Sequence, residues 1–341
     1  MDPSRYSRQV LFPGIGIEGQ DAISESRVVI IGCGALGSMQ SEMLARAGVG
    51  RLKIIDRDFV ELSNLHRQIL FNEQDARENQ PKVVAAAKRL ALVNSAVNVE
   101  PVVADVNFSN VEDLIADADV VLDGTDNFET RYLINDAAVK LGIPWVYGAA
   151  VGSSGLQMTV RPGKSPCLTC VWPESPAPGT FPTCDTGGVI LPIIALIASL
   201  QVTETLKLAM GRTNELHSSL LQFDSWTNRY THLNLANAKR ADCKTCGQHN
   251  FEYLSGREAQ MTSTLCGRNA VQVWPSRATR VDLEELASKM RNTGRVTHNK
   301  YLVRMSADPY EITVFADGRS IIKGTEDTAI ARSLYSRYVG A

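Results

Sequence analysis

The chain has 341 residues, of which 44% are hydrophobic and 21% charged, and its formal net charge is −2. This length is enough for about two domains with a sizeable core. Because Lys and Arg do not outnumber Asp and Glu, the composition argues against a protein that binds nucleic acid by neutralising phosphates. It also excludes collagen-like, coiled-coil and disordered chains.

The N-terminal sequence and the longest apolar stretch bear on the location of the protein. The segment MDPSRYSRQV is polar and lacks the apolar core of a secretory signal peptide. The stretch from Val189 to Leu200 contains Pro192 and is too short to span a bilayer, so we expect a buried helix there. These features predict a soluble, cytoplasmic protein without a membrane partner.

Strands and helices alternate in the first half of the chain. Short β-branched runs indicate strands, and longer periodic stretches indicate helices. We expect strands at Arg27–Gly32, Leu52–Asp56, Val97–Val103 and Val120–Asp123, and helices at Ser38–Ala47 and Pro81–Val93. This βαβ series predicts an α/β fold with a Rossmann-like, doubly wound, mostly parallel sheet and helices on both faces.

The second half begins with a change of composition. Residues 162–182 are rich in Pro, Gly, Ser and Cys, which predicts an exposed, mobile loop without regular structure. An apolar helix is expected at Val189–Met210 and a strand near Ser219–Phe223. We therefore expect a first domain at 1–250, with a Pro-rich crossover loop at about 171–188.

A separate small α+β module is expected at 255–341. It would contain a strand at Ala270–Trp274, a helix at Asp282–Met290, hairpin strands around Tyr310–Ile322 and a final helix at Glu326–Tyr338. The turn Ala316-Asp317-Gly318 is typical of a hairpin.

Three glycines form the pattern GxGxxG between the first strand and the first helix, at Gly32, Gly34 and Gly37. Glycines let the backbone approach a nucleotide phosphate, and Asp56, 19 residues beyond Gly37, can accept hydrogen bonds from a ribose. The alternative is a tight turn without a ligand. The motif alone would favour NAD.

Polar residues follow the second strand at spacings that would bring them together: Asp58, Asn64, Arg67, Gln68 and Lys82. Asn64, Arg67 and Gln68 share one face if their segment is helical. Lys82 begins a predicted helix, whose N-terminal dipole favours anions. Acidic groups beside two cations and an amide suit a triphosphate better than a dinucleotide, and the alternative is a solvated charged face.

Asp126 lies in the sequence GTDN, directly after the strand Val120–Asp123. Ligands bind at the C-terminal ends of parallel strands, and a carboxylate beside a triphosphate can hold Mg²⁺. The alternative is that Asp126 caps the helix predicted at Phe128–Ala138.

Four of the seven cysteines form two CxxC pairs, Cys167 with Cys170 and Cys243 with Cys246, separated by residues 171–242. Two such pairs predict a tetrahedral four-thiolate zinc site, which is structural because no ligand position remains for water. Redox dithiols are the alternative, but no thioredoxin-like context surrounds either pair.

The remaining cysteines and one histidine have less defined roles. Cys184 follows the Pro-rich stretch, so it is either a nucleophile of lowered pKa or an unreactive, half-buried residue. Cys33, inside the glycine turn, is expected to be a packing residue. Cys266 is expected to be structural, with a role in sulfur relay as the alternative, and His66 is expected to pack or lie at the surface.

Together these residues resemble the MoeB/ThiF/HesA family, the bacterial relatives of ubiquitin-activating enzymes. The resemblance runs from Arg5 to Gln248. The matching motifs are RYSRQ, GCGALG, IIDRDFVELSNLHRQ, QPK, GTDN, CLTC, TCDTGGV and CKTC. The module at 255–341 is similar to the short α+β tail of some longer bacterial members.

The resemblance implies ATP-dependent adenylation of the C-terminal glycine of a ubiquitin-like sulfur carrier ending in Gly-Gly, similar to ThiS or MoaD, with release of pyrophosphate. Asp56 would bind the ribose and Asp126 would hold Mg²⁺. Asn64, Arg67, Gln68 and Lys82 would contact the phosphates. Arg8 would reach the ATP of a neighbouring protomer, which implies a homodimer.

Sulfur for the implied reaction would come from a separate persulfide donor. Cys184 matches a loop cysteine that bonds covalently to the carrier in ThiF-like members and that MoeB-like members do not need for adenylation. Three alternative functions are a peptide-adenylating enzyme of an antibiotic pathway, a non-catalytic scaffold for a ubiquitin-like protein and an NAD dehydrogenase. The dehydrogenase hypothesis does not explain Arg8 or the zinc cysteines.

Overall fold

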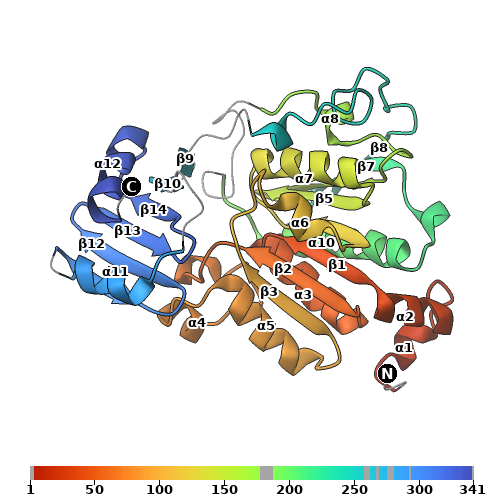
Figure 1. The fold of residues 1–341 in the computed structure, drawn as a ribbon. Coiled ribbons are helices and arrows are strands. Elements are labelled where there is room, and N and C mark those ends of the chain that lie inside the picture. Colours follow the sequence, from red (N-terminus) through yellow and green to blue (C-terminus); the bar gives the residue numbers. More distant parts are fainter. Residues whose placement is uncertain are drawn as a thin grey trace. The chain divides into compact units, whose positions relative to one another are not determined.

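A computed structural model describes residues 4–176, 187–256, 262–265, 269–274, 280–291 and 293–339, with only the backbone at 262–265. The described residues form two compact units (Figure 1). The first contains 4–176 and 187–256, and the second contains the described residues from 262 onward. That each unit is an independent domain, as expected from the sequence, stays a prediction.

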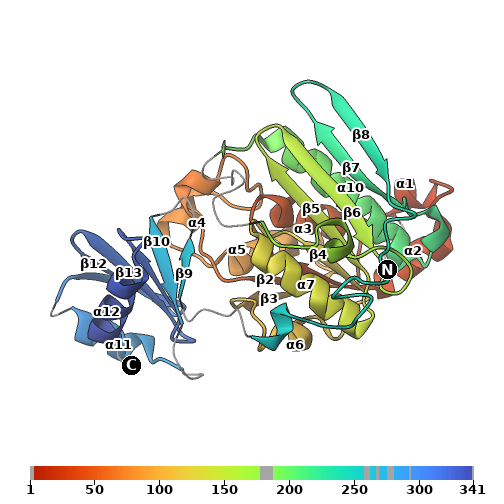
Figure 2. The same ribbon diagram turned by 90° about the horizontal axis from the view of Figure 1, so that it is seen from above.

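An eight-stranded sheet forms the first unit, in the order β3-β2-β1-β4-β5-β6-β7-β8 (Figures 1 and 2). Its parallel strands are β1 (Arg27–Ile31), β2 (Arg51–Asp56), β3 (Asn98–Val103), β4 (Val120–Asp123) and β5 (Trp145–Val151). The strands β6 (Ser154–Val160), β7 (Ser219–Asp224) and β8 (Arg229–Asn234) continue it antiparallel. The predicted mostly parallel α/β fold is therefore confirmed.

Helices cover both faces of this sheet because alternate strand residues point to opposite sides. Val28 and Ile30 belong to one core cluster, which includes residues of α3 (Ala35–Ala47) and α5 (Lys82–Val93). Val29 and Ile31 belong to another, which includes residues of α6 (Val111–Ile115) and α7 (Phe128–Leu141). The shorter helices are α1 (Ser7–Val10), α2 (Gly16–Glu25), α4 (Glu73–Arg77), α8 (Leu168–Val171) and the 3₁₀ turns Leu62–Asn64, Thr213–Glu215 and Tyr253–Ser255.

The apolar helix α10 (Leu191–Ala209) packs on the sheet. By length and composition it could cross a membrane, and 44% of its apolar window is buried. Ile193, Ile194 and Ile197 are at most 1% exposed and form a core cluster with Leu36 of α3. The predicted buried helix is confirmed.

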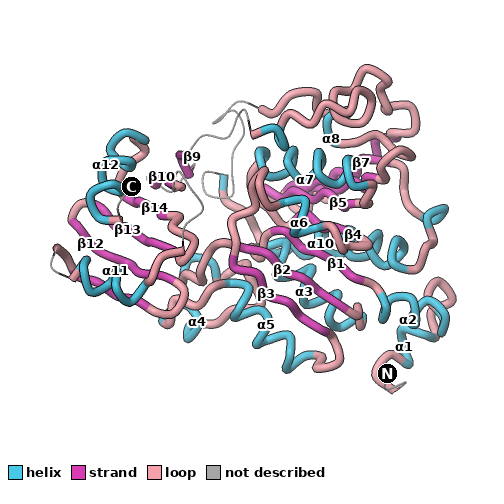
Figure 3. The backbone as a smooth tube through the Cα atoms, viewed as in Figure 1, coloured by secondary structure: helices cyan, strands magenta, loops and turns pink. Residues whose placement is uncertain are grey.

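One expectation about local structure was wrong for the described residues 162–176, and one condition, a helix at Asn64–Gln68, was not met, while residues 177–182 lie outside the described residues. The stretch 162–182 contains the short helix α8, whose turn places Cys167 and Cys170 near one another. The segment from Asn64 to Gln68 is a 3₁₀ turn followed by irregular turns rather than an α-helix. Elsewhere the chain from the end of β8 to Tyr253 is loop (Figure 3).

The second unit is an antiparallel sheet of six strands in the order β11-β12-β13-β14-β10-β9, with two helices. Its strands are β9 (Thr262–Leu265), β10 (Ala270–Val273), β11 (Arg295–His298), β12 (Leu302–Ala307), β13 (Tyr310–Phe315) and β14 (Ser320–Lys323). The helices α11 (Leu283–Met290) and α12 (Thr328–Tyr338) pack in one core cluster with alternate residues of the sheet (Figure 2). The predicted hairpin is present as β13 and β14.

Candidate active site and metal centre

The glycine turn after β1 packs tightly on one side and is open on the other. Gly32 has a φ of +94°, and a Cβ there would lie 2.5 Å from the carbonyl oxygen of Gly124. A Cβ on Gly37 would overlap the carbonyl of Gly32. At Gly34 a Cβ would find only Nε2 of Gln68, at 3.9 Å. Two glycines therefore serve packing, and the third leaves room beside the backbone for a ligand such as a phosphate.

The carboxylate of Asp56 holds this turn at the C-terminal end of β2. Its Oδ2 accepts a hydrogen bond of 2.6 Å from the N–H of Cys33, and its Oδ1 accepts one of 2.7 Å from the N–H of Asp58. A carboxylate oxygen has two lone pairs, so each oxygen can still accept a ribose hydroxyl. Asp56 is thus oriented beside the glycine turn, as a ribose-binding carboxylate requires.

Two cations lie next to these acidic groups. Lys82 begins α5, its side chain is 5% exposed, and its Nζ is 3.3 Å from Oδ2 of Asp58. The Nη1 atom of Arg57 lies 2.6 Å from Oδ1 of Asp105. Burial acts to lower the pKa of Arg57, but the carboxylates of Asp105 and Asp58 outweigh it and raise the pKa. Arg57 was not among the residues predicted from the sequence, although its place between two aspartates at a strand end was a usable signal.

The segment after β2 buries two amide side chains. Asn64 is 6% exposed, and its Oδ1 accepts a hydrogen bond from the N–H of Glu61. Gln68 is 3% exposed, and its Oε1 accepts no hydrogen bond within the described part of the chain. A buried amide oxygen without a donor is costly, so Gln68 fits a site that a ligand completes. Arg67 donates to the carbonyl of Ser63, and His66 is exposed.

Asp126 does not cap the helix that follows it. The N-cap of α7 is Asn127, whose Oδ1 accepts a hydrogen bond of 2.9 Å from the N–H of Thr130. Asp126 itself is exposed in the turn between β4 and α7. The helix-cap alternative is therefore excluded, and the carboxylate lies beyond a parallel strand, where a divalent cation could bind.

Arg8 lies away from the other predicted site residues of its own chain. It is exposed on α1, and the neighbouring Gln9 donates to the carbonyl of Ala47 at the C-terminal end of α3. The glycine turn precedes the N-terminal end of the same helix (Figure 1). A helix of 13 residues spans about 20 Å, so the structure does not bring Arg8 to the glycine turn.

The four cysteines of the two CxxC pairs form one cluster. All four sulfurs lie within 4.8 Å of one another, with Sγ–Sγ distances of 3.9 Å from Cys167 to Cys170, 3.6 Å from Cys167 to Cys243 and 3.3 Å from Cys170 to Cys246. A zinc ion with four sulfurs at about 2.3 Å has sulfur–sulfur edges of about 3.8 Å. The cluster therefore fits tetrahedral zinc.

Helix α7 supports both cysteine segments. Asn135 accepts a hydrogen bond from the N–H of Leu168 and donates to Thr169. Asp136 accepts hydrogen bonds from the hydroxyl of Thr245 and the N–H of Tyr253. Burial raises the pKa of Asp136 to about 6, against the lowering effect of these hydrogen bonds.

Two of the predicted cysteine roles cannot be compared with the structure. Cys184 and Cys266 lie outside the described residues. Cys33 is fully buried, and burial raises the pKa of its thiol, with Asp56 adding to the effect. This agrees with a packing role for Cys33.

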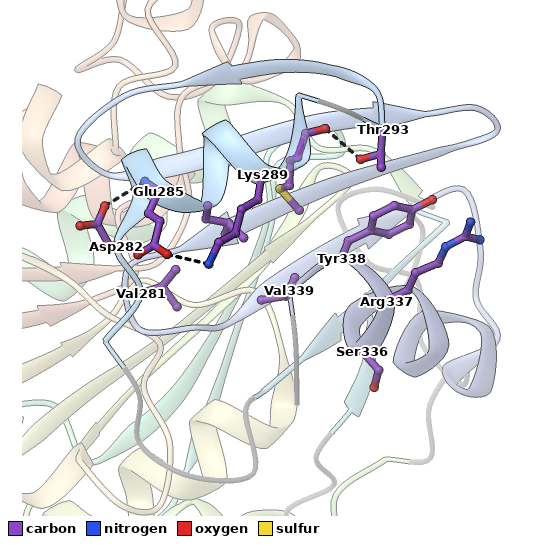
Figure 4. A pocket seen from close by; sticks show the side chains of 11 residues that line it. Val281, Asp282, Glu285, Lys289, Thr293, Ser336, Arg337, Tyr338 and Val339 are labelled. Carbon is purple, nitrogen blue, oxygen red and sulfur yellow. Dashed lines mark hydrogen bonds and ion pairs between the residues drawn. The ribbon is translucent and has the colours of Figure 1, made fainter.

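The second unit contains a pocket of about 410 Å³ between α11 and α12 (Figure 4). Its charged side chains include Glu285 and Lys289, which pair at 2.6 Å, and the hydroxyl of Thr293 donates to the carbonyl of Met290. Glu285 and Lys289 are thus paired with each other, and the hydroxyl of Thr293 is used by the backbone of its own helix end.

Comparisons of the sequence with known proteins agree on one family, and a comparison of structures shows a shared fold. Residues 6–245 match the sequence profile of the ThiF family. The chain is 47% identical to the sulfur carrier protein ThiS adenylyltransferase of Bacillus subtilis over 98% of this chain and 99% of that protein. It is 38% identical to a sulfur carrier protein adenylyltransferase of Thermus thermophilus over 77% and 96% of the two chains. The crystal structure of Escherichia coli MccB with ATP has a similar fold, with a TM-score of 0.63 and 23% identity over 72% of this chain and 75% of MccB.

Proposed function

Since the chain belongs to the ThiF family, we propose that it is an ATP-dependent adenylyltransferase that activates the C-terminal glycine of a ubiquitin-like sulfur carrier. The observation that carries the proposal is the 47% identity to a ThiS adenylyltransferase over nearly the whole of both chains. The geometry supports it independently, because an open glycine turn, an oriented carboxylate and buried Gln68 and Lys82 fit a nucleoside triphosphate.

The proposed reaction forms a bond between the carrier's terminal carboxylate and the α-phosphorus of ATP. The bond from that phosphorus to the oxygen of the leaving pyrophosphate breaks, and the carrier is left as an acyl adenylate. Lys82 and Arg67 would neutralise charge on the phosphates as it moves toward the leaving group. Asp56 would hold the ribose, and Asn64 and Gln68 would complete the phosphate contacts.

A magnesium ion would be held by Asp126. When bound, Mg²⁺ supplies positive charge that offsets the repulsion between the phosphates and the attacking carboxylate. Asp126 suits this role because it is exposed beyond β4 and is not used as a helix cap. The cysteine cluster would hold zinc as a structural ion, with four thiolates and no place for a substrate.

The active protein would be a homodimer in which Arg8 of one protomer reaches the nucleotide of the other. Two observations support this. Arg8 lies near the C-terminal end of α3, and the length of that helix, about 20 Å, separates it from the glycine turn of its own chain. The same N-terminal region exposes Leu11, Phe12 and Ile17, each at least 60% accessible, which suits burial against a second copy.

The test is exchange of labelled pyrophosphate into ATP, measured with ThiS-type and MoaD-type carriers ending in Gly-Gly. Exchange that requires one carrier supports the proposal and identifies that carrier. Carriers that lack the last glycine serve as the matched control and should give none. Exchange driven only by short peptides would favour a peptide substrate, and tight ATP binding without exchange would favour a scaffold. A separate persulfide donor would then complete sulfur transfer to the adenylated carrier.

A further inference from the structure

A buried ion pair lies beneath the turn that carries Asp126. Asp123, the last residue of β4, is fully buried, and its Oδ2 accepts a hydrogen bond of 3.0 Å from Nε of Arg131. Arg131 belongs to α7 and is only 6% exposed. The two charges therefore depend on each other, because either one alone would be buried without compensation.

Both partners of this pair bind the backbone of the turn. Thr125 donates its N–H and its hydroxyl to Oδ1 of Asp123, at 2.9 and 2.6 Å. The carbonyl of Thr125 belongs to the peptide bond that precedes Asp126, and it accepts a hydrogen bond of 2.9 Å from Nη2 of Arg131. The backbone directly before Asp126 is thus fixed from both sides, while the Asp126 side chain remains at the surface.

The same guanidinium connects the turn to β5. Its Nη2 also donates to the carbonyl of Gly148 at 3.2 Å, and its carbon lies 5.6 and 5.4 Å from the ring centres of Phe128 and Tyr147. A planar guanidinium makes these contacts simultaneously because its donors point in fixed directions. A lysine ammonium cannot bind Asp123, Thr125 and Gly148 in the same way.

Arg131 is also linked electrostatically to Asp126. Burial acts to lower the pKa of Arg131, but Asp123, with smaller contributions that include Asp126, raises it above its usual value. The guanidinium is therefore charged, and its field reaches the carboxylate at the surface of the turn.

We propose that Arg131 is a positioning residue for the divalent cation, because through Thr125 it holds Asp126 in the geometry that binds the metal beside the nucleotide. The inference rests on the proposed function, which assigns Mg²⁺ to Asp126. Arg131 is 6% exposed and donates to the backbone carbonyls of Thr125 and Gly148, so its proposed role is to hold the turn and not to contact the nucleotide or the metal. Groups that orient a metal ligand in this way commonly affect metal affinity by 10- to 100-fold.

The test measures metal binding rather than turnover. Wild type and Arg131→Lys are saturated with a non-hydrolysable ATP analogue and titrated with Mn²⁺, and free Mn²⁺ is followed by electron paramagnetic resonance. We expect Arg131→Lys to weaken Mn²⁺ binding about tenfold. Binding of the analogue in EDTA should stay within about twofold, because Asp56, Gln68 and Lys82 are unchanged. Equal Mn²⁺ affinities in the two proteins would overturn the proposal.

A control separates positioning from a loss of stability. Val139→Ala removes buried methyl groups from the same helix and leaves every contact of the turn in place. It should lower the Tm but leave Mn²⁺ affinity unchanged, and weaker Mn²⁺ binding in this variant would contradict the proposal. If Arg131→Lys does not fold, Thr125→Val removes only the hydroxyl donor to Asp123 and should weaken Mn²⁺ binding several-fold.

The experiment does not depend on a carrier. Absence of pyrophosphate exchange with every carrier would refute the proposed function, while the comparison of Mn²⁺ affinities would still decide the role of Arg131. Wild-type protein that binds the analogue but no Mn²⁺ would overturn the assignment of the cation to Asp126 and this inference with it.

Discussion

At the scale of single residues, adjacent side chains in the turn after β4 have separate roles. Asp126 is exposed at the surface of the turn, whereas Asn127 caps α7. The sequence placed both residues beyond a strand but could not divide the roles, since Asp and Asn are equally good caps. The hydrogen bond from Thr130 to Asn127 decides the question.

This division predicts opposite effects for two neighbouring substitutions. Asp126→Ala should abolish pyrophosphate exchange, with a Tm close to that of wild type. Asn127→Ala should lower the free energy of unfolding by about 1 kcal/mol and retain most of the exchange activity, because it removes only a cap. Thermal unfolding and exchange assays on both variants check the pair. A strongly destabilised Asp126→Ala would show that the carboxylate has a structural role.

Lys82 offers a second prediction at this scale. Its buried ammonium faces Asp58 at the start of α5, whereas Lys88 on the same helix is exposed. Lys82→Gln should reduce kcat/KM for exchange by at least about 100-fold, as expected for loss of a charge that stabilises a phosphoryl transition state. Lys88→Gln is the matched control and should be unaffected. Comparable losses in both variants would refute a specific role for Lys82.

At the scale of elements, the strands that were predicted from the sequence are those rich in β-branched residues. The runs at Arg27–Gly32 and Val120–Asp123 were predicted as strands because Val and Ile favour strands, but the strand Trp145–Val151 was missed. This strand contains Gly148, where a Cβ would collide with the side chain of Gln201 on α10. Trp145, Val146 and Tyr147 favour a strand by residue type, but the small residues that follow them weaken the local pattern. The side chain that packs against Gly148 lies far along the chain.

The residues of the candidate site also differ in whether they could be predicted from the sequence. Spacing and residue type were enough to nominate Asp56, Lys82 and the four cysteines, because motifs are local in sequence. The burial of Gln68 and the hydrogen bonds of Arg131 depend on segments that meet only in the fold. Gln68 was therefore predicted from its motif without its burial, and Arg131 was not predicted.

Helix α7 carries a titratable group whose effect on stability can be measured. The folded pKa of Asp136, about 6, lies above its unfolded value of 3.8, so its contribution to stability is present at low pH and is lost as the pH rises through 6. Relative to Asp136→Asn, wild type should gain about 1 kcal/mol of unfolding free energy between pH 7 and pH 5. Denaturant unfolding at the two pH values measures this, and the variant corrects for other titrating groups. A pH-independent difference would refute the raised pKa.

The cysteine cluster gives a prediction for the elements that it joins. One zinc per chain should be found by elemental analysis, and a strong chelator should lower the Tm and expose the segments around Cys167 and Cys243 to hydrogen exchange. Cys33→Ser, which changes a buried cysteine outside the cluster, should retain the zinc. An unchanged melting curve after removal of the metal would argue against a structural role.

At the scale of the whole molecule, the proposed dimer makes each active site depend on two chains. Arg8→Ala and Asp126→Ala should each be inactive as homodimers, but after mixing and subunit exchange the heterodimer contains one intact site. Recovery of up to about a quarter of wild-type activity is expected for statistical mixing. Analytical ultracentrifugation should show a dimer in both variants. Absence of any recovery despite exchange of subunits would place Arg8 in the site of its own chain.

The sequence similarity to a relative extends over the second unit. The match to the Bacillus subtilis protein covers 98% of this chain and therefore includes this unit, whereas the ThiF profile ends at residue 245. The cytoplasmic location of the protein stays a prediction.

Zinc bound by the four cysteines would also change the topology of the chain. With zinc bound, residues 171–242 form a closed ring whose ends are fastened through sulfur. By analogy with a disulfide, closing a ring of this size restricts the unfolded chain by about 4 kcal/mol. A single proteolytic cut inside the ring would therefore open it without releasing a fragment. The two pieces would separate only after both denaturation and removal of the metal, so a nicked protein could migrate as intact until it is chelated.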